Sequence, residues 1–136
     1  MTVAEKILAL HAVFPFSQLP AEDLLIAANA FVPRTYAPGS MICPAGETIN
    51  RLYVRVGGDL IDAAGRVVHP VVGTTCLLTG QPTPYLIKVG PSGYQGLLLP
   101  RGKFLTLINE CPVLLLGFFQ MPLLGLDYAG TPASPS

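Results

Sequence analysis

The sequence predicts a mainly β (α+β) domain: a double-stranded β-helix, or jelly roll, preceded by two helices and followed by two more. The main observation is a series of short apolar runs between Val32 and Leu99, separated by Pro, Gly, Asn and Asp. Short strands with this turn chemistry are typical of a β-sandwich or β-barrel. Outside this region apolar residues recur at helical spacing, which predicts the flanking helices. The chain has 136 residues, 51% of them hydrophobic, enough for one domain with a sizeable core.

Two helices are expected before the strands. Thr2-x-x-Glu5 is a capping box, so the first helix begins at Val3 and ends before the Phe-Pro pair at positions 14 and 15. Pro20, placed at a first helical position with two acids behind it, begins the second helix. The apolar positions of this helix form one broad face that the sheet would bury.

Seven apolar runs are expected to form strands, and turns rich in glycine connect them. In chain order the runs are VPRTY, SMICP, RLYVRV, DLID, RVVHPVV, PYLIKV and YQGLLL. Residues 37–40 (Ala-Pro-Gly-Ser) suit a tight turn, Gly57-Gly58 suits a hairpin or a bulge, and residues 63–65 (Ala-Ala-Gly) suit a second hairpin. This alternation of short apolar runs and turns predicts a barrel or sandwich of jelly-roll type.

Two helices are expected after the strands. Apolar residues between 104 and 108 have helical spacing that ends at Cys111, and a further helix spans residues 112–119. The domain therefore covers residues 1–122. Residues 123–136, which end in the small and proline-rich AGTPASPS, are expected to form a flexible tail.

The stretch from Val72 to Val89 is the candidate site. A glycine turn at Gly73 leads into one helical turn, and later glycine and proline residues prevent a long helix before the next strand. This arrangement presents backbone N–H groups at a helix N-terminus, which suits an anion such as phosphate. The candidate pocket residues are Gly73, Thr74, Thr75, Cys76, Leu77, Pro82, Thr83, Pro84 and Tyr85.

Three separated blocks carry a family resemblance. They are Tyr36-x-x-Gly39-x-x-Ile42-x-x-x-Gly46-Glu47, Gly73-x-x-x-Leu77-Leu78 and Leu98-Leu99-Pro100-Arg101. Their order and spacing resemble the cyclic-nucleotide-binding domain family, from about Leu10 to Phe119. The Leu-Leu-Thr-Gly-x-Pro-x-Pro form also resembles the version at the N-terminus of bacterial proteins that continue into CBS-domain pairs and a nucleotidyltransferase-like domain. The resemblance implies a non-catalytic regulatory module that binds a nucleotide-like small molecule.

Two charged positions of the family's phosphate cassette are missing. Thr74 stands where the family has the glutamate that accepts the ribose hydroxyl, and Pro84 stands where it has the arginine that clamps the phosphate. Each loss costs about 1.5 to 3 kcal/mol, so affinity for cAMP or cGMP falls by roughly 10² to 10⁴. The nearest substitute cations are Lys88 and Arg66, and both suit a solvated strand face.

Three functional hypotheses follow, and all stay open at this point. In the first, the chain is a sensor or receiver with a degenerate pocket. In the second, it is a structural interaction or dimerisation domain whose own side chains fill the pocket. In the third, it is a genuine cyclic-nucleotide receptor that uses a non-standard cation.

The sequence offers no support for an enzyme. Glu47 lies in a family turn, His11 and His69 are solitary, and Asp59 and Asp62 point to opposite faces of a strand. None of the serines lies in a Gly-x-Ser-x-Gly motif, and the His and Glu residues that could bind a metal are not clustered in the sequence. We therefore expect no catalytic residue, no metal and no cofactor.

The expected interaction surface lies at the C-terminal end, where the segment from Leu114 to Leu126 is almost wholly apolar. Either these residues fold back over the barrel, or they form an interface for a homodimer or an effector domain. The interface residues would be Leu115, Phe118, Phe119 and Leu123.

Composition limits the partners and the compartment. Lys plus Arg and Asp plus Glu number 8 each, so nucleic acid is not an expected partner. The longest apolar run, Val113 to Leu126, contains Gln120 and Pro122 and is too short for a membrane span. Three isolated cysteines indicate buried free thiols, and with no signal peptide the expected compartment is the cytoplasm.

Overall fold

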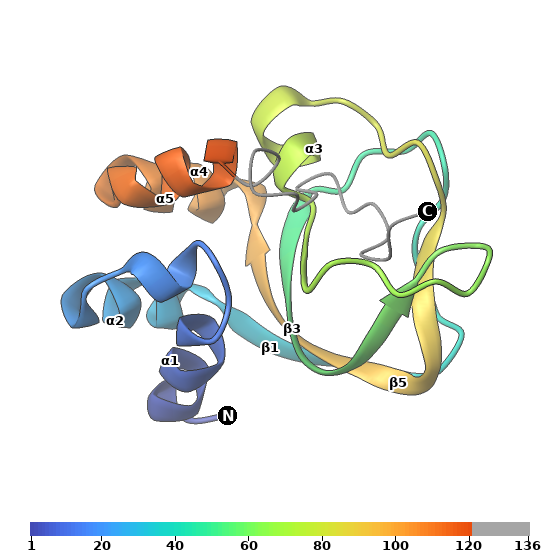
Figure 1. The fold of residues 1–136 in the computed structure, drawn as a ribbon, viewed down its shortest axis with the longest axis horizontal. Helices are drawn as coiled ribbons and strands as arrows, with labels where there is room; N and C mark the ends of the chain where they lie inside the picture. Colours follow the sequence, from blue (N-terminus) through green and yellow to red (C-terminus); the bar gives the residue numbers. More distant parts are fainter. Residues whose placement is uncertain (121–136) are drawn as a thin grey trace.

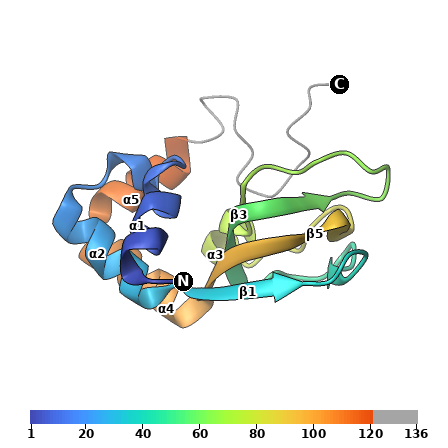
Figure 2. The ribbon, with the colours of Figure 1, turned by 90° about the horizontal axis from the view of Figure 1, so that it is seen from below.

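The computed structural model describes residues 1–120. Helices α1, α2, α4 and α5 gather on one side, and the strands with the short helix α3 lie on the other (Figure 1). A second view, turned by 90°, shows the same separation (Figure 2). The molecule therefore has a helical layer packed against a sheet, with α3 at one end of the sheet (Figure 1).

The N-terminal helices follow the capping signals. In α1 (Val3–His11), Thr2 and Glu5 form the expected capping box, with bonds of 3.0 and 3.1 Å. A short 3-10 turn, η1 (Phe16–Gln18), leads into α2 (Ala21–Ala30). Pro20 is the N-cap of α2 rather than its first helical residue, because its extended backbone (ψ 163°) ends the preceding segment.

The strands form one antiparallel sheet. They are β1 (Val32–Tyr36), β2 (Met41–Cys43), β3 (Arg51–Ile61), β4 (Val71–Val72) and β5 (Ile87–Pro100). The order is β1-β5-β3-β4, and β2 also pairs with β5. The expectation of a closed barrel is therefore wrong. The sheet stays open because β1 and β4, at the two ends of this order, do not pair with each other.

Seven expected runs become five strands because two pairs of runs are continuous. RLYVRV and DLID form the single strand β3, with register shifts around Gly57 and Gly58. PYLIKV and YQGLLL form the 14-residue strand β5, which starts at Ile87. RVVHPVV forms only β4 and an isolated bridge between Val67 and Ile61. The glycine pair is thus a bulge and not a hairpin.

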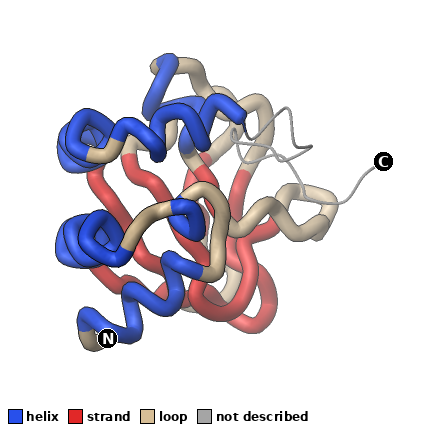
Figure 3. The backbone as a smooth tube through the Cα atoms, turned by 60° about the vertical axis from the view of Figure 1, so that its left-hand side comes forward, coloured by secondary structure: helices blue, strands red, loops and turns tan. Residues whose placement is uncertain are grey.

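The C-terminal helices α4 (Arg101–Glu110) and α5 (Pro112–Gln120) complete the helical layer. Helices (blue) lie over strands (red) in Figure 3. The ring of Phe118 lies 5.4 Å from Phe104 and 5.9 Å from Phe16. A Cβ added at Gly117 would come 2.3 Å from the Pro15 side chain, so α5 fits tightly against the segment before α2.

The sheet separates two hydrophobic cores, because alternate residues of a strand face opposite sides. Leu52 and Val54 of β3 join the core beneath the helices, whereas Tyr53 between them joins a second core on the other face. No single helix in residues 1–120 has the length and hydropathy of a membrane span. The pair α4 and α5 passes that test only in combination, with a bend of 108°.

Candidate functional site

The candidate cassette begins with a left-handed glycine. Tyr53 of β3 pairs with Val72 of β4, and Gly73 follows with φ +106°, a backbone conformation that favours glycine. A Cβ there would come 2.7 Å from the Arg51 carbonyl oxygen. Gly73 caps α3 (Thr74–Thr79), which ends at another left-handed glycine, Gly80. The glycine turn and the single short helix therefore form as the sequence predicts.

The position of the family's glutamate is closed to solvent. The Thr74 residue is 0% exposed, and its Oγ1 is buried without a hydrogen-bond partner among residues 1–120. The Thr75 Oγ1 is also buried without a hydrogen-bond partner among these residues. Thr79 differs, because its hydroxyl donates to the Thr75 carbonyl at 2.7 Å. The hydroxyls of Thr74 and Thr75 thus point into packed protein.

Helix α3 joins the two cores at the end of the sheet. Cys76 is buried in the second core, and Leu77 is buried in the core beneath the helices. Arg101, the first residue of α4, donates from Nε to the Leu77 carbonyl at 3.3 Å. A cation at a helix C-terminus is favourable. The cassette is therefore connected directly to the C-terminal helices.

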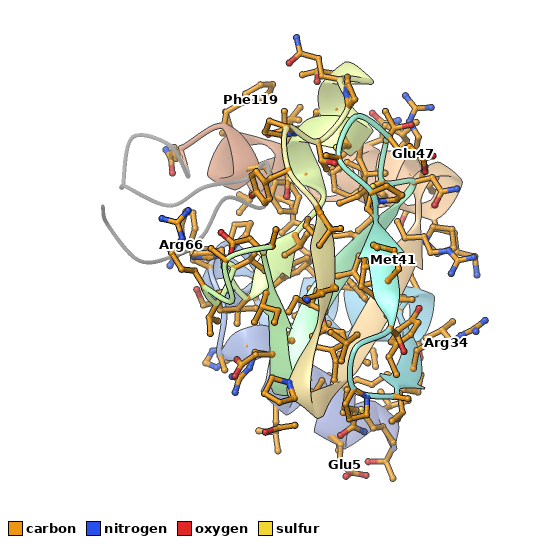
Figure 4. The ribbon with its side chains drawn as sticks, turned by 90° about the vertical axis from the view of Figure 1, so that its right-hand side faces the viewer. Glu5, Arg34, Met41, Glu47, Arg66 and Phe119 are labelled. Carbon is orange, nitrogen blue, oxygen red and sulfur yellow. The ribbon has the colours of Figure 1, made fainter. Side chains whose placement is uncertain are left out.

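The loop after α3 is fastened to the Gly46-Glu47 turn. The Thr83 N–H donates to the Glu47 carbonyl at 2.9 Å, and the Gly46 N–H donates to the Thr83 carbonyl at 2.8 Å. The Thr83 hydroxyl donates to the Glu47 carbonyl at 3.1 Å, and Thr83 is 1% exposed. Glu47 acts here through its backbone, and its side chain lies at the surface (Figure 4). This agrees with the structural role expected for Glu47.

The position of the family's arginine provides no charge. Pro82 and Pro84 are exposed, and Tyr85 is half-buried against the second core. Of the substitute cations, Arg66 forms an ion pair with Asp62 at 3.2 Å and is thereby committed to its own turn. Lys88 lies on β5 and is partly buried.

The second core lies next to the cassette, and most of its side chains come from the sheet. The second core consists of Cys43, Ile49, Tyr53, Leu60, Val68, Val72, Cys76, Ile87, Val89, Tyr94 and Leu98. Tyr36 also packs here, with its ring 6.3 Å from that of Tyr94. Burial raises the pKa of Tyr53 to about 12 and raises the pKa of Tyr94 as well. These phenols therefore stay neutral at physiological pH.

Sequence reasoning missed this group of tyrosines. Tyr36 and Tyr94 are opposite each other in the β1–β5 pairing, and Tyr53 lies on the neighbouring strand β3. The alternation of side chains along each strand was a partial signal for this grouping. It required the strand register, which the chain order alone does not provide.

The expected interface residues lie in different environments. Phe118 is 1% exposed and belongs to the helical core, and Leu115 packs against that core. Phe119 is 55% exposed, and Leu116, which the sequence pattern did not single out, is 63% exposed. Leu123 and the expected tail 123–136 lie outside the described residues. The interface itself stays a prediction, with Phe119 and Leu116 as its exposed part.

The remaining polar candidates have local structural roles. Asp62 accepts bonds of 2.9 Å from the Ala64 and Arg66 N–H groups, and these bonds, led by that of Arg66, lower its pKa. Asp59 pairs with Arg55 at 3.2 Å. The His69 Nδ1 accepts from the Val71 N–H at 3.3 Å. Cys43, Cys76 and Cys111 are free and buried, as expected.

The comparisons with known proteins place the fold. No protein-family model and no curated protein matches the sequence. Among solved structures, cAMP-bound PfPKA-R matches with a TM-score of 0.69 at 20% identity over 92% of this chain. The catabolite activator protein of Thermus thermophilus matches with a TM-score of 0.65 at 23% identity over 81% of it. A regulatory subunit of a cAMP-independent protein kinase A from Trypanosoma brucei matches with 0.68 at 25% identity over 92%.

This chain spans about half the length of those three, namely 49%, 55% and 50%. The chain therefore has the fold of a cyclic-nucleotide-binding domain, and the expected jelly-roll class with flanking helices is confirmed.

Proposed function

We propose that this chain is a non-catalytic regulatory module that has lost cyclic-nucleotide binding and keeps the cassette as a structural link. The fold is that of regulatory cyclic-nucleotide-binding domains. The observation that carries the proposal is the complete burial of Thr74 at the glutamate position. A ribose hydroxyl cannot reach a side chain that the protein itself encloses.

The packing beneath α3 supports a filled pocket. Cys76 faces the second core, which already contains large side chains such as Tyr53 and Tyr94. A ligand there would have to displace side chains that are less than one tenth exposed. Since protein interiors are close-packed, such displacement costs stability and disfavours binding.

The absence of the family's arginine also disfavours binding of a cyclic nucleotide. Pro84 offers no donor, and Arg66 is held by Asp62. One of the similar structures is a regulatory subunit of a cAMP-independent protein kinase A, and a triple mutant of it is bound to cAMP in the A site. A cyclic-nucleotide-binding fold without cAMP dependence thus has a solved precedent, and substitutions accompany cAMP binding in it.

The proposed output is contact through the C-terminal helices. Arg101 connects α3 to α4, and α5 exposes Leu116 and Phe119 next to the end of the described chain. Exposed large apolar side chains of this kind suit a second copy of the chain or an effector domain. The cytoplasm remains the proposed compartment, because the three cysteines are free and buried.

Isothermal titration calorimetry with cAMP, cGMP and cyclic dinucleotides tests the loss of binding. We expect no saturable heat up to about 1 mM ligand, since the two missing contacts move a micromolar affinity into the millimolar range. Binding with a micromolar midpoint would contradict the proposal and would favour a genuine receptor with a non-standard cation.

The double variant Thr74→Glu, Pro84→Arg separates a filled pocket from an intact pocket that lacks charge. In a filled pocket the new carboxylate is buried without a partner, so we expect no gain of binding and a lower unfolding free energy. Pro84→Arg alone is the matched control, because Pro84 is exposed and the change should leave stability nearly unchanged. Micromolar cAMP binding by the double variant would show that the pocket is open.

A further inference from the structure

Three of the five arginines are held by partners within the protein. Arg55 pairs with Asp59 at 3.2 Å, Arg66 pairs with Asp62 at 3.2 Å, and Arg101 donates to the Leu77 carbonyl at 3.3 Å. The other two are Arg34 of β1 and Arg51 of β3. Within residues 1–120 their side chains form neither an ion pair nor a hydrogen bond with another residue. These two guanidinium groups thus have unused binding capacity.

Arg34 and Arg51 line the same hollow on the sheet. It has a volume of about 130 Å³, and its other lining residues are Val32, Leu98 and Pro100. The lining contains both cations and no acidic residue. Like charges that share one hollow repel each other, and a bound anion removes that repulsion.

The strand register shows why the two cations converge. Arg34 is paired with Gly96 and Arg51 with Pro100, two positions of equal parity on β5. Both arginines therefore rise from the same face of the sheet, on the strands that flank β5. Neighbouring strands are about 4.8 Å apart and residues rise about 3.4 Å along a strand, so the two Cα atoms, two strands and four register positions apart, are separated by roughly 16 Å. Two extended arginine side chains with a phosphate between them can span this distance. The Arg34 side chain extends outward from its edge strand (Figure 4) and is exposed, so a solute can reach its guanidinium group.

The chemistry of this hollow selects an oxyanion. A guanidinium presents planar paired donors that match phosphate or carboxylate oxygens, and it is always charged. The apolar residues Val32 and Leu98 provide a surface for a small carbon body beside the anion.

We propose that Arg34 and Arg51 form a binding site for a small phosphate-bearing molecule, either inorganic phosphate or a phosphomonoester. This site goes beyond the proposed function, because it lies outside the cassette and does not depend on the loss of cyclic-nucleotide binding. It is nevertheless close to the cassette. The Arg51 carbonyl oxygen is the atom that a Cβ at Gly73 would meet at 2.7 Å, so the same strand segment supports both.

An NMR titration of the whole chain with inorganic phosphate at low ionic strength tests the proposal. We expect saturable amide shifts in β1 and β3 around Arg34 and Arg51. Arg34→Gln and Arg51→Gln should each weaken binding about tenfold or more, the loss of one charge-assisted contact. Arg55→Gln is the matched control: it removes the same charge from the same face but from a residue that does not line the hollow. We expect its affinity to stay within about twofold of the wild type.

Two results would overturn the site. One is the absence of saturable shifts up to about 50 mM phosphate, well above the millimolar range of a weak specific site. The other is an equal loss of affinity in Arg55→Gln and Arg51→Gln, which would mean that phosphate responds only to net charge. Arg34→Lys keeps the charge but not the planar fork, so it should also bind phosphate more weakly than the wild type, and an unchanged affinity would contradict recognition by paired donors. A parallel titration with glycerol phosphate identifies the source: tighter binding than phosphate supports a phosphomonoester, and equal binding supports inorganic phosphate.

Discussion

Replacement of Gly73 by alanine gives the most direct test of the cassette geometry. Gly73 has φ +106°, outside the range that L-residues adopt easily. The new methyl carbon would also come 2.7 Å from the Arg51 carbonyl oxygen and 3.1 Å from the Ile49 Cγ2 atom. The substitution therefore adds backbone strain and a clash with a strand that cannot easily move.

The two contributions can be separated with a second glycine. Gly80, at the other end of α3, has φ +74°, and a methyl group added there would have no neighbouring atom within 4 Å. Gly80→Ala therefore costs only the left-handed strain, about 1 to 2 kcal/mol. Gly73→Ala adds the cost of overpacking, about 1 to 3 kcal/mol, which gives roughly 2 to 5 kcal/mol in all.

Urea unfolding followed by circular dichroism measures this difference. If the two proteins unfold in a two-state manner with equal slopes, the difference in midpoint reports the clash alone. We expect Gly73→Ala to be less stable than Gly80→Ala by at least about 1 kcal/mol. Equal stability of the two variants would refute the close approach of Gly73 to Arg51 and the cassette geometry built on it.

Four further outcomes are expected. Thr83→Val, which loses a hydroxyl that donates at 3.1 Å, should cost about 1 kcal/mol. Thr74→Val, which removes a buried hydroxyl that has no partner in residues 1–120, should leave the urea midpoint unchanged or raise it, and a fall as large as that of Thr83→Val would refute the assignment. Arg101→Met should cost about 0.5 to 1.5 kcal/mol by the loss of its bond to α3, and an equal cost for the exposed control Lys103→Met would mean that the bond contributes nothing. Backbone N–H bonds lower the pKa of Asp62, so the stability that its carboxylate contributes is present above the unfolded value of 3.8 and is lost as the pH falls through the lower folded value. Between about pH 6 and pH 2 the melting temperature of Asp62→Asn should therefore fall less steeply with pH than that of the wild type. Parallel plots of melting temperature against pH would argue against this role.

The sequence predicted local structure well wherever the signal was itself local. The capping box of Thr2 and Glu5 placed the start of α1, and Gly73 and Gly80 marked both ends of α3. Such signals need only neighbouring residues, because a cap or a left-handed turn forms within a few positions. The C-terminal helices were located for the same reason.

Features that depend on strand pairing could not be predicted. The merging of two runs into β5, and of two more into β3, depends on which segments pair, as does the open edge at β4. The burial of Thr74 and Phe118 depends on packing from elements far away in the chain. The shared hollow of Arg34 and Arg51 also appears only when β1 and β3 are placed on either side of β5. Periodicity assigns a residue to a face but not to its neighbours.

The tight fit of α5 against Pro15 has a mechanical consequence. A methyl group at Gly117 would come 2.3 Å from that proline, and the rings of Phe16 and Phe118 meet beside it. Helix α5 and the segment before α2 are therefore closely packed against each other. A movement of α5 alone would have to break this contact, so we expect any transmitted motion to include the amino-terminal helices.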